Sequence, residues 1–114
     1  MNNGQDRRRW TPDNVLEAMR GRLTVSCQAY PGEPLRDPQT TAQMAQSVVA
    51  GGAAAVRVQG TDDVAAAVKA VDVPVVGLWK DGSDGVFITP TLDHALAVVA
   101  AGAQVVALDG TRRP

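Results

Sequence analysis

Cysteine, aromatic residues and long apolar runs are all scarce in this chain. The single cysteine, Cys27, cannot form an internal disulfide. No apolar stretch resembles the hydrophobic region of a signal peptide, and none is long enough to span a membrane. These absences predict a soluble, cytoplasmic protein.

Signals for metals, nucleotides and nucleic acids are also missing. The sequence holds one histidine, no pair of ligands at metal-binding spacing and no phosphate-binding P-loop. The net charge is −1, and the basic cluster at residues 7–9 lies in a polar stretch without hydrophobic periodicity. A triple arginine can contact phosphate, but a solvated tail is the interpretation we prefer. We therefore expect no metal, no nucleic-acid partner and no membrane contact.

Alanine and valine dominate the apolar 45% of the chain, which has one Phe, one Tyr and two Trp. Such small and β-branched side chains favour a core between strands and helices over a helical bundle. Helix-start signals recur four times, at Thr11, Asp37, Thr61 and Thr91. The helices are expected to end before Gly21 and Gly51, near Ala70 and before Gly102. The predicted strands are residues 22–27, 54–58, 73–79 and 104–108.

The expected strands are short, continuous apolar runs, as in buried parallel sheets. Residues 50–57 resemble residues 100–107, each a helix that ends on glycine and turns into a strand. We therefore predict the N-terminal half of a (β/α)8 TIM barrel, because a full barrel needs eight strands and typically about 250 residues. Residues 1–12 are expected to form a disordered tail, and residues 13–114 a partial barrel whose open edges indicate a truncated chain.

Polar residues follow each predicted strand, and the catalytic residues of TIM barrels lie at these strand ends. Lys80 is the strongest candidate for a catalytic residue. A lysine that leaves a buried strand loses hydration, which favours a neutral amine able to act as a base or to form a Schiff base. The alternative is a lysine that reaches out to solvent.

Three further strand-end residues are candidates for substrate contacts. Arg57 suits a hydroxyl, carbonyl or phosphate, or else pairs with Asp109 or Glu33. Gln28 offers a donor and an acceptor to a sugar, or else satisfies loop backbone groups. Asp109 can accept from substrate hydroxyls or orient Lys80, or else cap the amides of residues 111 and 112.

Two reactive residue types are assigned structural roles. Cys27 is expected in the core and not as a nucleophile, because no histidine lies near it in sequence. His94, in the first turn of a predicted helix, is expected at the surface.

The stretch from Leu23 to Leu35 resembles the opening strand and loop of the N-acetylmannosamine-6-phosphate 2-epimerase family. Three later stretches resemble the same family in the right order: 51–57, 74–80 with 87–91, and 101–114. The similarity spans residues 13–114 and implies a barrel of the ribulose-phosphate-binding type.

The resemblance implies interconversion of N-acetylmannosamine 6-phosphate and N-acetylglucosamine 6-phosphate in sialic acid and amino-sugar catabolism, without a cofactor. The implied chemistry opens the sugar to its aldehyde, removes the C2 proton and returns one to the opposite face. Lys80 matches the catalytic lysine of the family. Gln28 and Arg57 match its substrate-contacting positions, and Asp109 and Thr111 are weaker matches.

Two departures from the family pattern stand out. The loop after Lys80 is about two residues shorter than in many members. The catalytic glutamate and the phosphate-binding loops of the family belong to later strands, so we expect this chain alone to be a poor epimerase or none. Alternatives are another phosphate-binding barrel enzyme with a Schiff-base lysine, and a non-catalytic half barrel that pairs with a second copy or with a missing C-terminal half.

Overall fold

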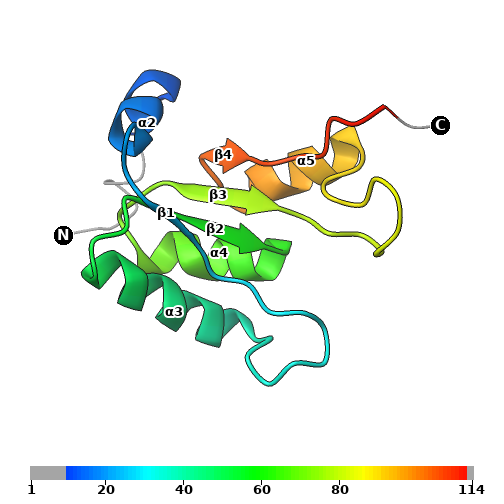
Figure 1. The fold of residues 1–114 in the computed structure, drawn as a ribbon, viewed down its shortest axis with the longest axis horizontal. Helices are drawn as coiled ribbons and strands as arrows, with labels where there is room; N and C mark the ends of the chain where they lie inside the picture. The colour runs from blue at the N-terminus through cyan, green and yellow to red at the C-terminus, as the bar shows by residue number, and fades with distance from the viewer. Residues whose placement is uncertain (1–9, 113–114) are drawn as a thin grey trace.

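The computed structural model describes residues 10–112, which form a four-stranded parallel sheet with flanking helices (Figure 1). The strands lie side by side in chain order: β1 (Thr24–Ser26), β2 (Ala55–Gln59), β3 (Val75–Leu78) and β4 (Val105–Val106). The helices are α2 (Pro12–Met19), α3 (Pro38–Ala50), α4 (Thr61–Ala70) and α5 (Leu92–Ala100). Helix and strand alternate four times, as the sequence predicts.

Three helices begin with the side-chain caps that their sequences predict. Thr11 caps α2 through a reciprocal capping box with Asn14. Asp37 and Thr91 accept hydrogen bonds from backbone amides in the first turns of α3 and α5. The predicted cap of α4 is wrong: Gly60 is the cap, with φ of 95°, and Thr61 already lies in the helix. Glycine fits here because this backbone conformation is strained for residues that carry a Cβ.

The apolar core lies between the sheet and helices α3 and α4. Val56 and Val58 of β2 are fully buried in it. Successive side chains of a strand point to opposite faces, so Arg57 and Gln59 project from the other face of the sheet. Because of this alternation, the polar side chains of β2 lie on the face of the sheet that the helices do not cover.

The two outer strands are shorter than predicted. β1 pairs with β2 over residues 24–26, and β4 pairs with β3 over residues 105–106. Within residues 10–112 each outer strand has one neighbour, whereas β2 and β3 are paired on both sides. A strand with one neighbour has fewer backbone hydrogen bonds to extend it, which accounts for the short ladders.

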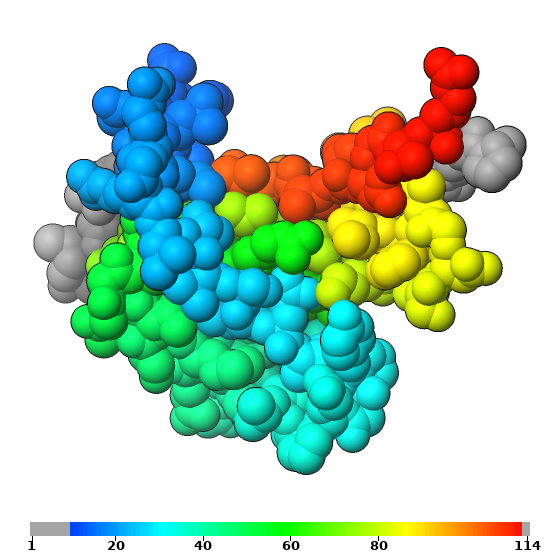
Figure 2. All heavy atoms as spheres, in the orientation of Figure 1, coloured from blue at the N-terminus to red at the C-terminus, as the bar shows by residue number. Residues whose placement is uncertain are grey.

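The uncovered face of the sheet is hollowed. In the space-filling view, α2 and the C-terminal segment rise at opposite ends of this hollow (Figure 2). Of the predicted disordered tail, residues 1–9 lie outside the described residues, whereas Thr11 and Pro12 belong to the start of α2.

Candidate active site

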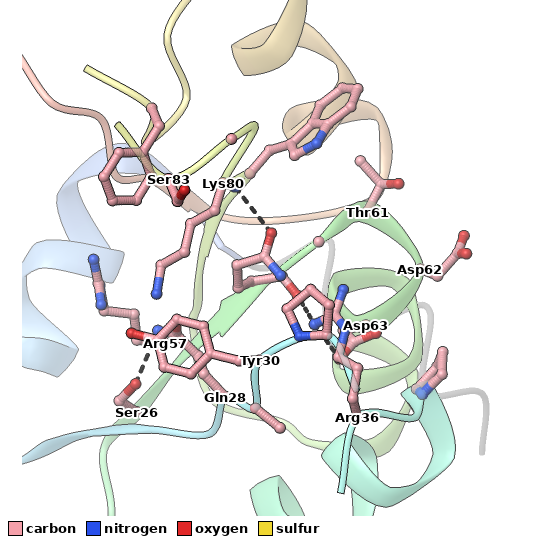
Figure 3. Close-up of a pocket in the computed structure, with 18 residues that line it drawn as sticks. Ser26, Gln28, Tyr30, Arg36, Arg57, Thr61, Asp62, Asp63, Lys80 and Ser83 are labelled. Atoms are coloured by element: carbon pink, nitrogen blue, oxygen red, sulfur yellow. Dashed lines mark hydrogen bonds and ion pairs between the residues drawn. The ribbon is translucent and has the colours of Figure 1, made fainter. Parts of the chain in front are cut away.

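A cleft of about 1070 Å³ opens at the carboxyl ends of β1, β2 and β3. Its lining includes Gln28, Arg57 and Lys80, which lie just after β1, within β2 and just after β3, and which come together in Figure 3. Parallel strands place their carboxyl ends at one edge of a sheet, so the strand-end residues of the sequence converge there. Asp109 and Thr111 are not among the residues that line the cleft.

Lys80 lies two residues beyond β3 and is half-buried. Its backbone N–H donates a 2.9 Å hydrogen bond to Oε1 of Gln59, and its backbone forms an antiparallel bridge with Ile88. Its Nζ lies 5.0 Å from the centroid of the Tyr30 ring, a distance at which the ring face attracts an ammonium group. The backbone of Lys80 is therefore fixed on both sides, and its side chain points into the cleft towards Tyr30 (Figure 3).

Arg57 lies in the middle of β2, opposite Ser26 of β1. Among residues 10–112 no carboxylate lies within ion-pair distance of its guanidinium, so the predicted alternative of a pair with Asp109 or Glu33 is wrong. Gln28 Nε2 donates a 2.9 Å hydrogen bond to Ser26 Oγ and not to a loop backbone group. Arg57 and Gln28 therefore both line the cleft, and neither side chain is held there by an ion pair.

Asp109 engages its own loop. Its carboxylate accepts a 2.9 Å hydrogen bond from the Thr111 N–H. Hydrogen bonds from the side chain and backbone of Thr111 hold the pKa of this carboxyl below its usual value, because they stabilise the charged form. The structure thus brings three of the five candidate residues together and leaves Asp109 and Thr111 at the adjacent strand end.

A polar cluster that the sequence does not predict lies at the wall of the cleft, which Arg36 and Asp63 help to line. Thr41 Oγ1 donates a 2.8 Å hydrogen bond to Asp63 Oδ2, and Arg36 Nη1 lies 3.4 Å from the same oxygen. Arg36 also donates to the backbone oxygen of Gln59 at 3.3 Å. These bonds join α3, α4 and the loop after β1 at the wall of the cleft. The one signal in the sequence is the pair of carboxylates that follows the helix-start residue Thr61, and it does not indicate which residues Asp63 contacts.

His94 is not at the surface as predicted. Its ring is half-buried, lies 4.4 Å from Trp79 in an edge-on arrangement and places Nε2 2.8 Å from Asp81 Oδ2. Sequence spacing could not reveal this pairing, because the loop that follows Lys80 folds back onto α5. Cys27 is buried as predicted, and burial raises the pKa of its thiol.

The family model named "Putative N-acetylmannosamine-6-phosphate epimerase" matches residues 41–114. That match covers more than half of the chain. The chain belongs to this family. A curated relative from Cutibacterium acnes with the corresponding 2-epimerase name is 65% identical over 101 residues, and one from Thermosynechococcus vestitus is 45% identical over 102 residues.

A solved family member has the same architecture. The N-acetylmannosamine-6-phosphate 2-epimerase from Clostridium perfringens superposes with a TM-score of 0.82 at 34% identity, over 87% of this chain and 44% of that one. This confirms the predicted half barrel of four parallel strands. The chain likewise spans 44% of the length of the Cutibacterium acnes relative, so less than half of each family protein is represented.

Within the described residues no three potential ligands among His, Cys, Asp and Glu gather as a metal site would require. The helices of residues 10–112 are too short or too polar to cross a membrane.

Proposed function

We propose that this chain supplies the N-terminal half of the active site of an N-acylglucosamine-6-phosphate 2-epimerase. The observation that carries the proposal is the meeting of Lys80, Arg57 and Gln28 in one cleft at the carboxyl ends of the strands. Family membership supplies the substrate class, a phosphorylated amino sugar. The proposal includes a cytoplasmic location and a place in sialic acid and amino-sugar catabolism, as the resemblance implies.

In the proposed reaction Lys80 acts as the base. Once the sugar has opened to its aldehyde, the neutral amine of Lys80 takes the C2 proton, and the electron pair left behind is delocalised onto the aldehyde oxygen. A proton returned to the other face of C2 inverts that centre. Arg57 and Gln28 are suited to hold sugar oxygens, because they present donors from neighbouring strands.

Two parts of the reaction require groups from the portion of the family proteins that this chain does not match. These are the acid that reprotonates the opposite face and the loops that anchor the phosphate. We therefore propose that the chain alone has little or no epimerase activity, because a base without a positioned substrate contributes little.

The test is reconstitution. The 114-residue chain is mixed with a separately produced C-terminal portion of the Cutibacterium acnes relative, and N-acetylmannosamine 6-phosphate is followed by NMR in D₂O. Deuterium at C2 together with formation of the gluco epimer is expected from the mixture and not from either part alone. A borohydride-trapped substrate adduct on Lys80 would instead support the Schiff-base alternative.

A non-catalytic half barrel is the second candidate function. It is favoured by the two outer strands, each with one neighbour among residues 10–112, and by the coverage of less than half of the relatives. Stable association with the C-terminal portion, but without turnover, would support this candidate.

A further inference from the structure

Gln59 is a polar residue of the cleft that neither the sequence motifs nor the proposed reaction assigns. It is the last residue of β2, and only 7% of its surface is exposed although it lines the cleft. Glutamine is costly to bury unless both ends of its amide are satisfied. The partners of its side chain therefore indicate its role.

The amide oxygen of Gln59 is already engaged. Oε1 accepts the backbone N–H of Lys80 at 2.9 Å, at the point where β2 turns into α4 and can no longer pair with the chain after β3. A backbone N–H can only donate, so this bond fixes which end of the amide is oxygen. The nitrogen, Nε2, must point the other way.

The amide nitrogen has no such partner. Within residues 10–112 no protein acceptor engages Nε2, and the atom is not sealed off from solvent. The backbone oxygen of the same residue accepts from Arg36, which is itself held by Asp63, so the position of Gln59 is rigid. Two N–H donors are thus held at the wall of the cleft beside the backbone of Lys80.

We infer that Gln59 is a further substrate-binding residue, whose Nε2 donates to a neutral oxygen, hydroxyl or carbonyl, of the sugar that Lys80 deprotonates. An uncharged amide suits such an oxygen, whereas the charged Arg57 in the same cleft suits an anionic one. This inference rests on the proposed function for the identity of the ligand. It adds a second role to a side chain that also fixes Lys80.

The same chain offers a matched control. Gln104 lies just before β4, and its Oε1 accepts the backbone N–H of Val75 at 2.8 Å. The two glutamines therefore make the same kind of bond to backbone amides at opposite ends of β3. Gln104 does not line the cleft at the strand ends.

The experiment is a titration with N-acetylmannosamine 6-phosphate, followed by NMR, of the ¹⁵N-labelled 114-residue chain in the mixture with the unlabelled C-terminal portion used for reconstitution. Inorganic phosphate serves as a second probe. The side-chain NH₂ signals of Gln59 are expected to shift with the sugar phosphate and not with phosphate alone, while those of Gln104 stay in place. Gln59→Met should weaken the affinity for the sugar phosphate by about three- to tenfold, and Gln104→Met by less than about twofold.

The outcomes are separable. If the Lys80 and Arg57 signals move and those of Gln59 do not, or if both glutamine variants weaken binding equally, Gln59 is only a structural support and the inference is overturned. A Gln59 response to inorganic phosphate alone overturns the assignment to a neutral oxygen. If no signal of the cleft moves, the chain does not bind this substrate, and the proposed function is overturned together with the inference.

Discussion

The side-chain hydroxyl of Thr89 donates a 2.7 Å hydrogen bond to the carbonyl oxygen of Ala107. The same hydroxyl accepts the backbone N–H of Trp79 at 3.1 Å, so one buried side chain joins the segments that leave β3 and β4. Thr89 holds a positive φ of 48°, which is unfavourable for a β-branched residue. The two hydrogen bonds offset that strain and fix the rim of the cleft next to Lys80.

Thr89→Val is therefore expected to destabilise the chain by about 1–3 kcal/mol, because it removes the side-chain partner of two partly buried backbone groups. Thr89→Ser keeps the hydroxyl and should cost about 1 kcal/mol, the value of one buried methyl group. Urea unfolding of the two variants measures the difference. Equal losses would mean that the hydroxyl contributes nothing beyond its volume.

Local patterns in the sequence predict the helices and strands, whereas contacts between the loops leave no such pattern. The alternation of caps and apolar runs predicts every helix and strand of residues 10–112, because these signals are local. Strand-end positions also predict that Gln28, Arg57 and Lys80 face one cleft, since parallel strands share an edge. The Thr89–Ala107 and Asp81–His94 pairs join residues more than ten positions apart through loops. No period or motif encodes such contacts, and for that reason the surface position predicted for His94 is wrong.

Gly77 of β3 packs closely against α5 and the segment that follows it. A Cβ at this position would lie 2.7 Å from Val98 and 2.8 Å from Ala103. Gly77→Ala should destabilise the chain by about 1–3 kcal/mol through overpacking. Gly51→Ala is the control, because Gly51 has φ of −81° and a Cβ there would lie no closer than 3.4 Å to another atom, an ordinary contact. It should change stability by less than about 0.5 kcal/mol. Thermal or urea unfolding compares the two, and an unaffected Gly77→Ala would show that α5 can move away.

Burial of Cys27 predicts a loss of stability at alkaline pH. Burial raises the pKa of its thiol, so above the ordinary pKa of a thiol the unfolded chain gives up this proton more readily than the folded chain does. The stabilising contribution is complete below that value and is lost as the pH rises through the raised one. Unfolding free energies measured from pH 7 to pH 10 should fall more steeply for the wild type than for Cys27→Ala. Parallel curves would show that the thiol ionises equally well in the folded chain.

Lys80 carries the chemical prediction, and Lys69 supplies its control. Lys69 is an exposed lysine in the last turn of α4 and is not part of the cleft. In the reconstituted mixture, Lys80→Met should lower the rate of deuterium incorporation at C2 by about 10²- to 10⁴-fold, the usual contribution of a general base. Lys69→Met should leave the rate unchanged, because it removes a charge of the same sign far from the substrate. Unfolding curves of the two variants separate a chemical loss from a folding defect. A Lys80→Met mixture that still exchanges C2 at the wild-type rate would place the base on another residue and leave Lys80 a binding role at most.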